Sequence, residues 1–257
     1  MTPALDRPFL TRLVAKARTE LAVLSALFIA ATGVLVFVEV ADDMNEADGQ
    51  AFDHHVLALM RPYPDDPGRP WGPWWLKEAA ADITALGGIS VLGLFALIVI
   101  VFLLAQRKWL SAVLLPVGLA GGVALSEGLK AVFERERPPV AVQAVETINA
   151  SFPSGHALLA TVFYLTVAVM LTRAFPQKRL KALVLGVGVL LALLVGATRI
   201  YLGAHWASDV IAGWAVGAAW AMVLWLAAYA VERFQKRRHA SLQDHETRER
   251  TQAATKV

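Results

Sequence analysis

Six apolar stretches, each close to the length of a membrane-crossing helix, constrain this chain more than any other feature of its sequence. A helix needs about 20 apolar residues with few charges to cross the hydrocarbon core of a bilayer. With 57% hydrophobic and 18% charged residues, the chain is also too apolar for a soluble protein of this length. We therefore expect an all-α, six-transmembrane-helix bundle, with spans near residues 21–38, 86–105, 110–129, 156–171, 182–197 and 210–231.

The polar segment between the first two spans, residues 41–81, is punctuated by prolines and carries an amphipathic patch at 52–60. Its tryptophans Trp71, Trp74 and Trp75 belong to the residue type that is enriched at the headgroup level of a bilayer. These features predict short interfacial helices between spans one and two. After the sixth span the sequence becomes highly charged, so residues 1–234 are interpreted as one membrane domain and 235–257 as a solvated, partly disordered tail.

The distribution of positive charge predicts the orientation of the bundle. When the loops are assigned alternately, 17 of the 24 Lys and Arg residues fall on the side of both termini. The positive-inside rule then places both termini in the cytoplasm and the opposite loops outside a cytoplasmic (inner) membrane. The basic balance is thus explained by topology, and no nucleic acid partner is implied. The chain has no cysteine, so disulfides and thiolate metal sites are excluded.

Residues that could bind an anion or catalyse a reaction lie where later spans meet the outer surface: Lys130, Arg137, Ser154, Gly155, His156, Arg199, His205 and Asp209. Alternating spans bring their outer ends to one end of the bundle. Three cations beside a helix that starts at Ser154 would form an anion site, because backbone N–H groups point outward there and Ser154 is a natural N-cap. We expect Lys130, Arg137, Ser154, Gly155 and Arg199 to bind phosphate oxygens.

Two histidines in an anion site point to catalysis in addition to binding. Asp209 follows His205 by one helical turn and can accept the Nδ1 proton, which leaves Nε2 free to attack phosphorus. His156 is then the acid that protonates the leaving oxygen and the base that activates water. With three fixed cations and no carboxylate cluster of the kind that magnesium prefers, we expect neither a metal nor another cofactor.

Three sequence fragments carry a family resemblance. KxxxxxxRP at 130–138, PSGH at 153–156 and RxxxxxHxxxD at 199–209 resemble, in order and spacing, the signature of the type-2 phosphatidic acid phosphatase (PAP2) superfamily. The resemblance covers the chain from the third span onward. It implies a nucleophile at His205, an acid at His156 and phosphate ligands at the five positions given above. Two departures are Thr198, where the family usually has serine, and Ala207, where many members have proline.

The resemblance implies metal-independent hydrolysis of a lipid phosphate or diphosphate presented from the outer leaflet. Undecaprenyl diphosphate, phosphatidylglycerophosphate and phosphatidate are the implied substrate classes, and the sequence does not choose among them. A phosphotransferase that passes the phosphoryl group to a second lipid or sugar is the alternative. A transporter or anion-binding membrane protein that catalyses no reaction is disfavoured, because no span carries an ionisable residue at its centre. The oligomeric state is left open.

Several polar residues have simpler interpretations. Arg61, Arg69 and Arg135 are expected to be headgroup anchors. Glu127, near the outer end of the third span, is either functional or paired with a basic neighbour, and the sequence does not decide. Because adjacent residues diverge on a helix, His54 and His55 do not predict a metal site. The GxxxG pattern at 213–217 predicts close packing between helices.

Overall fold

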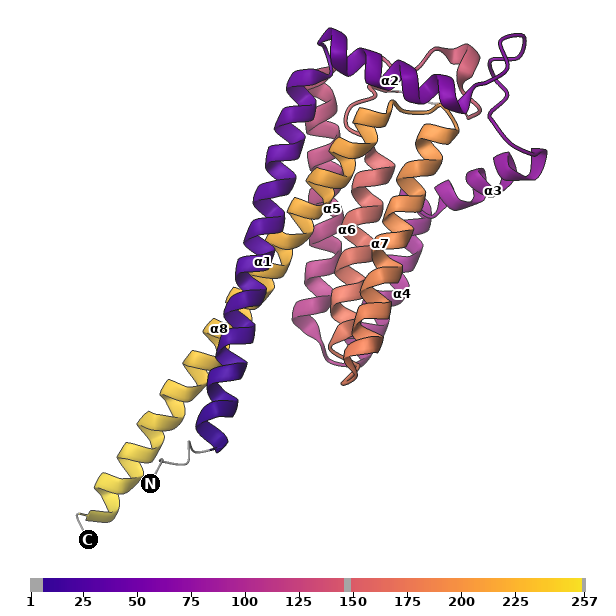
Figure 1. Ribbon diagram of the computed structural model, residues 1–257. Helices are drawn as coiled ribbons and strands as arrows, with labels where there is room; N and C mark the ends of the chain where they lie inside the picture. The colour runs from indigo at the N-terminus through magenta and orange to yellow at the C-terminus, as the bar shows by residue number, and fades with distance from the viewer. Residues whose placement is uncertain (1–6, 146–148, 256–257) are drawn as a thin grey trace, which may run out of the picture.

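The computed structural model describes residues 7–145 and 149–255, and this part of the chain is helical throughout, without strands (Figure 1). The helices are α1 (Arg7–Asp43), α2 (Ala47–Met60), α3 (Trp74–Ala85), α4 (Ile89–Ala105), α5 (Trp109–Phe133), a 3₁₀ turn η1 (Val140–Val142), α6 (Gly155–Thr172), α7 (Lys178–Tyr201) and α8 (Ala207–Thr255). The expected all-α class is confirmed.

Within residues 7–145 and 149–255, five helical segments are long and apolar enough to cross a membrane, namely those in α1, α5, α6, α7 and α8. A sixth span forms if α3 and α4 are counted as one helix, which is bent by 50° between Ala85 and Ile89. The second span expected at 86–105 therefore corresponds to α4, which has 17 residues and begins after the bend. Gly87 and Gly88 lie at this break, where their small size allows the chain to change direction.

Helices α2 and α3 are the expected short helices between the first two long spans. Figure 1 shows α2 lying across the end of the bundle, roughly perpendicular to the long helices. The amphipathic patch at 52–60 falls within α2, and Trp71, Trp74 and Trp75 are all more than half exposed. The first turns of α1 and the last turns of α8 lie at the opposite end of the molecule (Figure 1).

Helix α6 is the centre of the bundle. Half of its apolar window is buried inside the protein, against 11% for the corresponding window of α1. Its buried side chains include Leu158, Val162 and Phe163, which pack with Leu115 of α5 and Val195 of α7. Helix α1 packs mainly along α8, and its outward leucines and phenylalanine remain exposed, as is normal for a surface that faces lipid.

Glycines allow α8 to approach α6 closely. A Cβ atom added to Gly213 would lie 2.7 Å from the carbonyl oxygen of Ser154, and one on Gly217 would lie 2.8 Å from that of Leu158. The expected role of the GxxxG pattern in helix packing is thus confirmed. This approach sets the N-terminus of α6 beside that of α8.

The charged tail does not match its expected structure. Residues 235–255 were expected to be partly disordered, but they continue α8 as one helix up to Thr255. The segment contains neither Gly nor Pro and is rich in Glu, Gln, Arg and Ala, all of which favour helix. Helix propensity therefore outweighs the lack of an apolar face.

The glycine contact predicts a specific loss of stability. Gly217→Val places methyl groups against the backbone of α6 and should lower the free energy of unfolding by about 1–3 kcal/mol. Gly186→Val is the matched control, because a Cβ atom on Gly186 in α7 meets nothing within 4 Å. Thermal unfolding in detergent compares the two variants. Equal stability of both would show that the contact between α6 and α8 is not tight.

Candidate active site

The eight residues singled out in the sequence all lie at the end of the bundle that α2 covers. Lys130 is in the last turn of α5, Ser154 precedes α6, and Arg199 is in the last turn of α7. His205 lies in the short loop between α7 and α8, and Asp209 is in the first turn of α8. The expected convergence of these segments at one end of one bundle is therefore observed.

His205 is held on both sides of its ring. Its Nδ1 lies 3.3 Å from Oδ2 of Asp209, and its Nε2 lies 3.1 Å from Nη1 of Arg137. A guanidinium can only donate, so Nε2 is the acceptor and Nδ1 carries the proton toward Asp209. Burial lowers the pKa of His205 to about 4, although Asp209 opposes the shift. The ring is therefore a neutral imidazole at pH 7.

Arg137 is fixed by backbone carbonyls in two loops. Its guanidinium donates to the carbonyl oxygens of Asn149 at 2.9 Å, Ala150 at 3.3 Å and Ala204 at 2.7 Å. Burial lowers its pKa from the ordinary arginine value, while Asp209 raises it. An arginine remains charged under such a shift, so the site keeps a fixed cation beside Nε2 of His205.

Close packing brings Lys130 to the start of α6. A Cβ atom added to Gly155 would lie 3.0 Å from Oγ of Ser126, which is a tight contact, and 3.6 Å from Nζ of Lys130, which is an ordinary van der Waals distance. Lys130 also donates to Glu127 at 2.8 Å. Glu127 is therefore paired with a basic neighbour, which is one of the two interpretations that the sequence left open.

Unpartnered polar atoms gather at this end of the bundle. Among the described residues, four buried side-chain atoms lack a hydrogen-bond partner, and three of them belong to Ser126, Ser154 and Arg199. Buried polar groups without partners are costly and rare, so their presence indicates a site built for a ligand. Two hydroxyls and a guanidinium N–H are the donors that an anion requires.

Ser154 occupies the N-cap position of α6, as expected, but its hydroxyl makes no capping hydrogen bond. Its backbone N–H instead donates to the carbonyl oxygen of Asp209 at 2.9 Å, which ties the start of α6 to α8. The Ser154 side chain is fully buried. The hydroxyl is thus left available to a ligand.

His156 lies in the first turn of α6, close to the bend between α3 and α4. A Cβ atom on Gly88 would lie 3.9 Å from its Nε2. The charges of Arg199, Lys130 and Arg137, and the ring of His205, all act on His156. Arg199 also donates to the hydroxyl of Thr84 in α3 at 3.4 Å. The end of α3 therefore forms part of the site, which was not predicted from the sequence.

Three cations that we expected to be headgroup anchors have other partners. Arg135 has a side chain only 10% exposed and forms ion pairs with Asp209 at 2.6 Å and Asp53 at 2.7 Å. Arg61 donates to the carbonyl oxygens of Met60, Val142 and Tyr201. Arg69 stacks on the ring of Tyr63. For Arg135 and Arg61 the expectation was wrong, because buried acids bind the first guanidinium group and backbone carbonyl oxygens bind the second.

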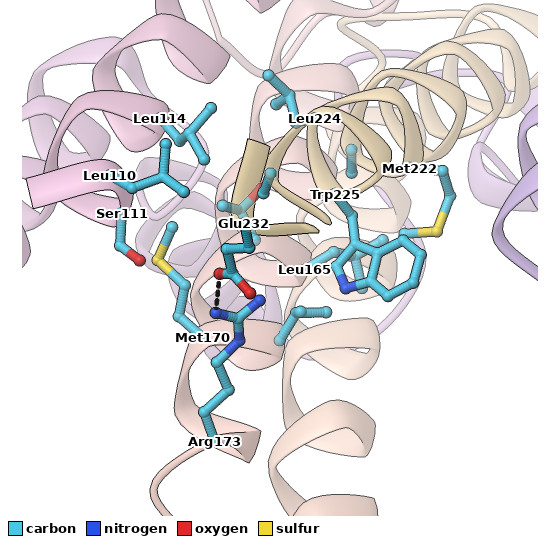
Figure 2. Close-up of a pocket in the computed structure, with 14 residues that line it drawn as sticks. Leu110, Ser111, Leu114, Leu165, Met170, Arg173, Met222, Leu224, Trp225 and Glu232 are labelled. Atoms are coloured by element: carbon cyan, nitrogen blue, oxygen red, sulfur yellow. Dashed lines mark hydrogen bonds and ion pairs between the residues drawn. The ribbon is translucent and has the colours of Figure 1, made fainter. Parts of the chain in front are cut away.

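Two further features lie outside this constellation. A cavity between α5, α6 and α8 is lined mainly by apolar side chains and has the ion pair of Arg173 with Glu232 beside it (Figure 2). The residues of α6 and its C-cap that line this cavity run from Leu165 to Arg173. Since Leu165 is more than two helical turns after His156, the near edge of the cavity lies about 13 Å along α6 from that histidine. Among the described residues, no three His, Asp or Glu side chains form a group suited to a metal ion.

Known proteins match a large part of this chain in sequence. The model of the PAP2 superfamily matches residues 111–233, from α5 into α8. Phosphatidylglycerophosphatase B of Bacillus subtilis is 34% identical over 145 residues, which cover 56% of this chain and 70% of the relative. An undecaprenyl-diphosphatase of Sulfolobus acidocaldarius is 32% identical over 120 residues, 45% of this chain and 54% of that protein.

Solved structures share the fold. The crystal structure of a transmembrane PAP2 type phosphatidylglycerolphosphate phosphatase from Bacillus subtilis has a TM-score of 0.73, 26% identity, and covers 80% of this chain and 99% of its own. The crystal structure of Aquifex aeolicus LpxE, at 24% identity, has a TM-score of 0.50 over 66% of this chain and 93% of its own, which supports the fold alone. The chain is therefore a multi-pass membrane protein that belongs to the PAP2 superfamily and, like the relatives it matches, is a phosphatase.

Proposed function

We propose that this protein hydrolyses a lipid phosphate or diphosphate through a covalent phosphohistidine at His205. The observation that carries the proposal is the position of the His205 ring, which is neutral, buried, and held between Asp209 and Arg137. A nucleophile needs an unprotonated nitrogen that is held in a fixed direction, and this arrangement supplies both at Nε2. The N–H that Arg137 donates to Nε2 turns to the phosphate oxygens when the substrate binds. The unpartnered donors of Ser126, Ser154 and Arg199 suit the phosphate it attacks.

In the first step, the Nε2 lone pair forms a bond to phosphorus while the bond from phosphorus to the leaving oxygen breaks. His156 gives a proton to that oxygen, so the lipid product leaves as an alcohol, or as a monophosphate when the substrate is a diphosphate. The Nδ1 proton of His205 stays toward Asp209, whose carboxylate stabilises the charge that the ring acquires.

In the second step, water attacks the phosphorus of the phosphohistidine and the bond from phosphorus to Nε2 breaks. His156, now without its proton, takes a proton from the water. Inorganic phosphate leaves and His205 returns to its neutral form. The same pair of histidines therefore completes both halves of the reaction, which consumes one water molecule and no oxidant or reductant.

Fixed positive charge stabilises both transition states in this scheme. Lys130, Arg137 and Arg199 bind the phosphoryl oxygens, with the Ser154 hydroxyl and the Gly155 N–H at the N-terminus of α6. Ser126, whose hydroxyl lies beside Gly155, is an additional donor. Because protein cations already neutralise the oxygens, the scheme needs no divalent metal ion.

The names of the matched relatives and the position of the site at the end of a membrane bundle support this substrate class. The names of the matched relatives specify phosphatidylglycerophosphate and undecaprenyl diphosphate, and phosphatidate is chemically close to the former. All of these carry a phosphate on an apolar tail, which matches a cationic site at the end of a membrane bundle. The charge distribution of the loops supports an inner-membrane location with both termini cytoplasmic and the site facing outward.

Loss of the nucleophile is the first test. His205→Ala should lower phosphate release from phosphatidylglycerophosphate in detergent micelles by a factor on the order of 10³ or more, because no other group replaces Nε2. His55→Ala is the matched control, since His55 is exposed on α2. Assays without an added acceptor also separate hydrolysis from transfer. Turnover retained by His205→Ala would assign the attack to another group.

Removal of divalent metals is the second test. With EDTA present throughout, kcat/KM for the same lipid should change by less than about twofold, because the charge that a metal would supply comes from three protein cations. Activity that disappears in EDTA and returns with magnesium would contradict the role given to these cations.

The orientation is testable because the chain contains no cysteine. Single cysteines introduced by Asp66→Cys, in the loop after α2, and Gln177→Cys, between α6 and α7, occupy exposed positions. A membrane-impermeant maleimide should label the first variant in intact cells and the second only after the membrane is permeabilised. The reverse pattern would place the site of His205 in the cytoplasm.

A further inference from the structure

We propose that Asp53 of α2 and Arg135 act together as positioning residues that fix the carboxylate of Asp209, and through it the ring of His205. Asp53 lies outside the three sequence fragments that carry the family resemblance. Arg135 lies within the first fragment, at a position where the fragment specifies no residue type. The inference rests on the proposed role of His205 as the nucleophile. It gives the surface helix α2 an indirect part in the reaction, through Asp209 and His205.

The two oxygens of Asp209 have different partners. Oδ2 lies 3.3 Å from Nδ1 of His205, accepts from the backbone N–H of Trp206 at 2.9 Å, and also accepts from the hydroxyl of Ser151. Oδ1 accepts from Nη1 of Arg135 at 2.6 Å. Arg135 is thus the charged partner of the oxygen that does not face the histidine. Its contact fixes the rotation of the carboxylate about its own axis.

Arg135 is itself held from the other side by Asp53. Nη2 of Arg135 donates to Oδ2 of Asp53 at 2.7 Å, while Nη1 also donates to the hydroxyl of Ser208 at 2.7 Å. The carboxylates of Asp53 and Asp209 are almost completely buried, with exposures of 1% and 0%. Two buried acids therefore share one guanidinium, whose planar, branched shape allows a separate contact to each.

Asp53 also anchors the start of α8. Its Oδ1 accepts from the backbone N–H of Ser208 at 2.9 Å, and its Oδ2 accepts from the Ser208 hydroxyl at 2.5 Å. The first N–H groups of a helix have no partner within the helix, and an acid is favoured there by the helix dipole. A residue of α2 thus caps the helix that carries Asp209, so the position of α2 and that of the Asp209 carboxylate are coupled.

Charge balance makes the three residues interdependent. If Arg135 is removed, two buried carboxylates are left close together without their shared cation. If only Asp53 is neutralised, Arg135 keeps Asp209 as a partner but loses the contact that fixes its second nitrogen. The first change should therefore be more harmful than the second, because an uncompensated buried charge is costly.

The experiment compares Asp53→Asn with Asp48→Asn. Both remove a carboxylate from α2, but Asp48 is exposed in the first turn and lies outside the network. Asp53→Asn should lower kcat for phosphatidylglycerophosphate by about 10- to 100-fold, because small misplacements of a reacting group have effects of this size. KM should change by less than about threefold, since the phosphate ligands are untouched. Asp48→Asn should match the wild type in both constants.

A second variant and a spectroscopic readout address loss of folding. Arg135→Lys keeps the charge, but one ammonium cannot hold both carboxylates in the same geometry, so kcat should fall again with KM nearly unchanged. In ¹⁵N-histidine spectra, wild-type His205 should show one protonated and one unprotonated ring nitrogen. In Asp53→Asn and Arg135→Lys these two signals should move toward each other as the tautomers mix. His205→Ala assigns the signals.

The possible outcomes separate this inference from the proposed function. If Asp53→Asn and Arg135→Lys are folded and keep both wild-type kcat and the wild-type His205 signals, the pair serves only to dock α2 and the inference is wrong. This conclusion holds even if their melting temperatures fall. If His205→Ala retains turnover in the same assay, the proposed function itself fails. Loss of turnover in His205→Ala with unchanged Asp53→Asn overturns the inference alone.

Discussion

The contact between Asp209 and His205 is the interaction on which the rest of the site depends. Asp209 is fully buried, and a carboxylate in such a place is tolerated only when hydrogen bonds and a cation replace the water it has lost. Its partners come from the loop before α6, from the loop after α7 and from Arg135 after α5. The single acid therefore joins the segments that contribute to the site.

The packing of the bundle makes this contact possible. Gly213 and Gly217 let α8 lie directly against the backbone of α6, so the N-termini of the two helices are adjacent at one end. The Ser154 N–H then reaches the carbonyl oxygen of Asp209, and Ser151 reaches its side chain. Apolar contacts between α5, α6 and α7 hold the remaining motif residues at the same end. Packing within the membrane thus determines the geometry of the polar site.

The sequence predicted the features that depend on local pattern. Hydropathy indicated the spans, and the spacing from His205 to Asp209 predicted their contact. Long-range partners were missed. Asp53 and Ser208 are 155 positions apart, and an acid in a polar segment between spans gives no sign that it will be buried. Arg135 was interpreted as a headgroup anchor, because the sequence near it does not show that its partners are the buried acids Asp53 and Asp209. Thr84 and Ser126 were also missed. For Thr84 the sequence did hold a signal that we did not use, the glycine pair at 87 and 88, which lies at the bend that brings α3 to the site.

The central claim is that the phosphoryl group passes through His205, and locating that group tests it most directly. In His156→Ala, an aryl phosphate whose leaving group needs no added proton should phosphorylate the enzyme but hydrolyse slowly, because the base for the second step is absent. Rapid quenching at alkaline pH followed by peptide mass spectrometry should find the phosphate on His205. Phosphate on another residue, or turnover with no covalent phosphoenzyme, would contradict the mechanism.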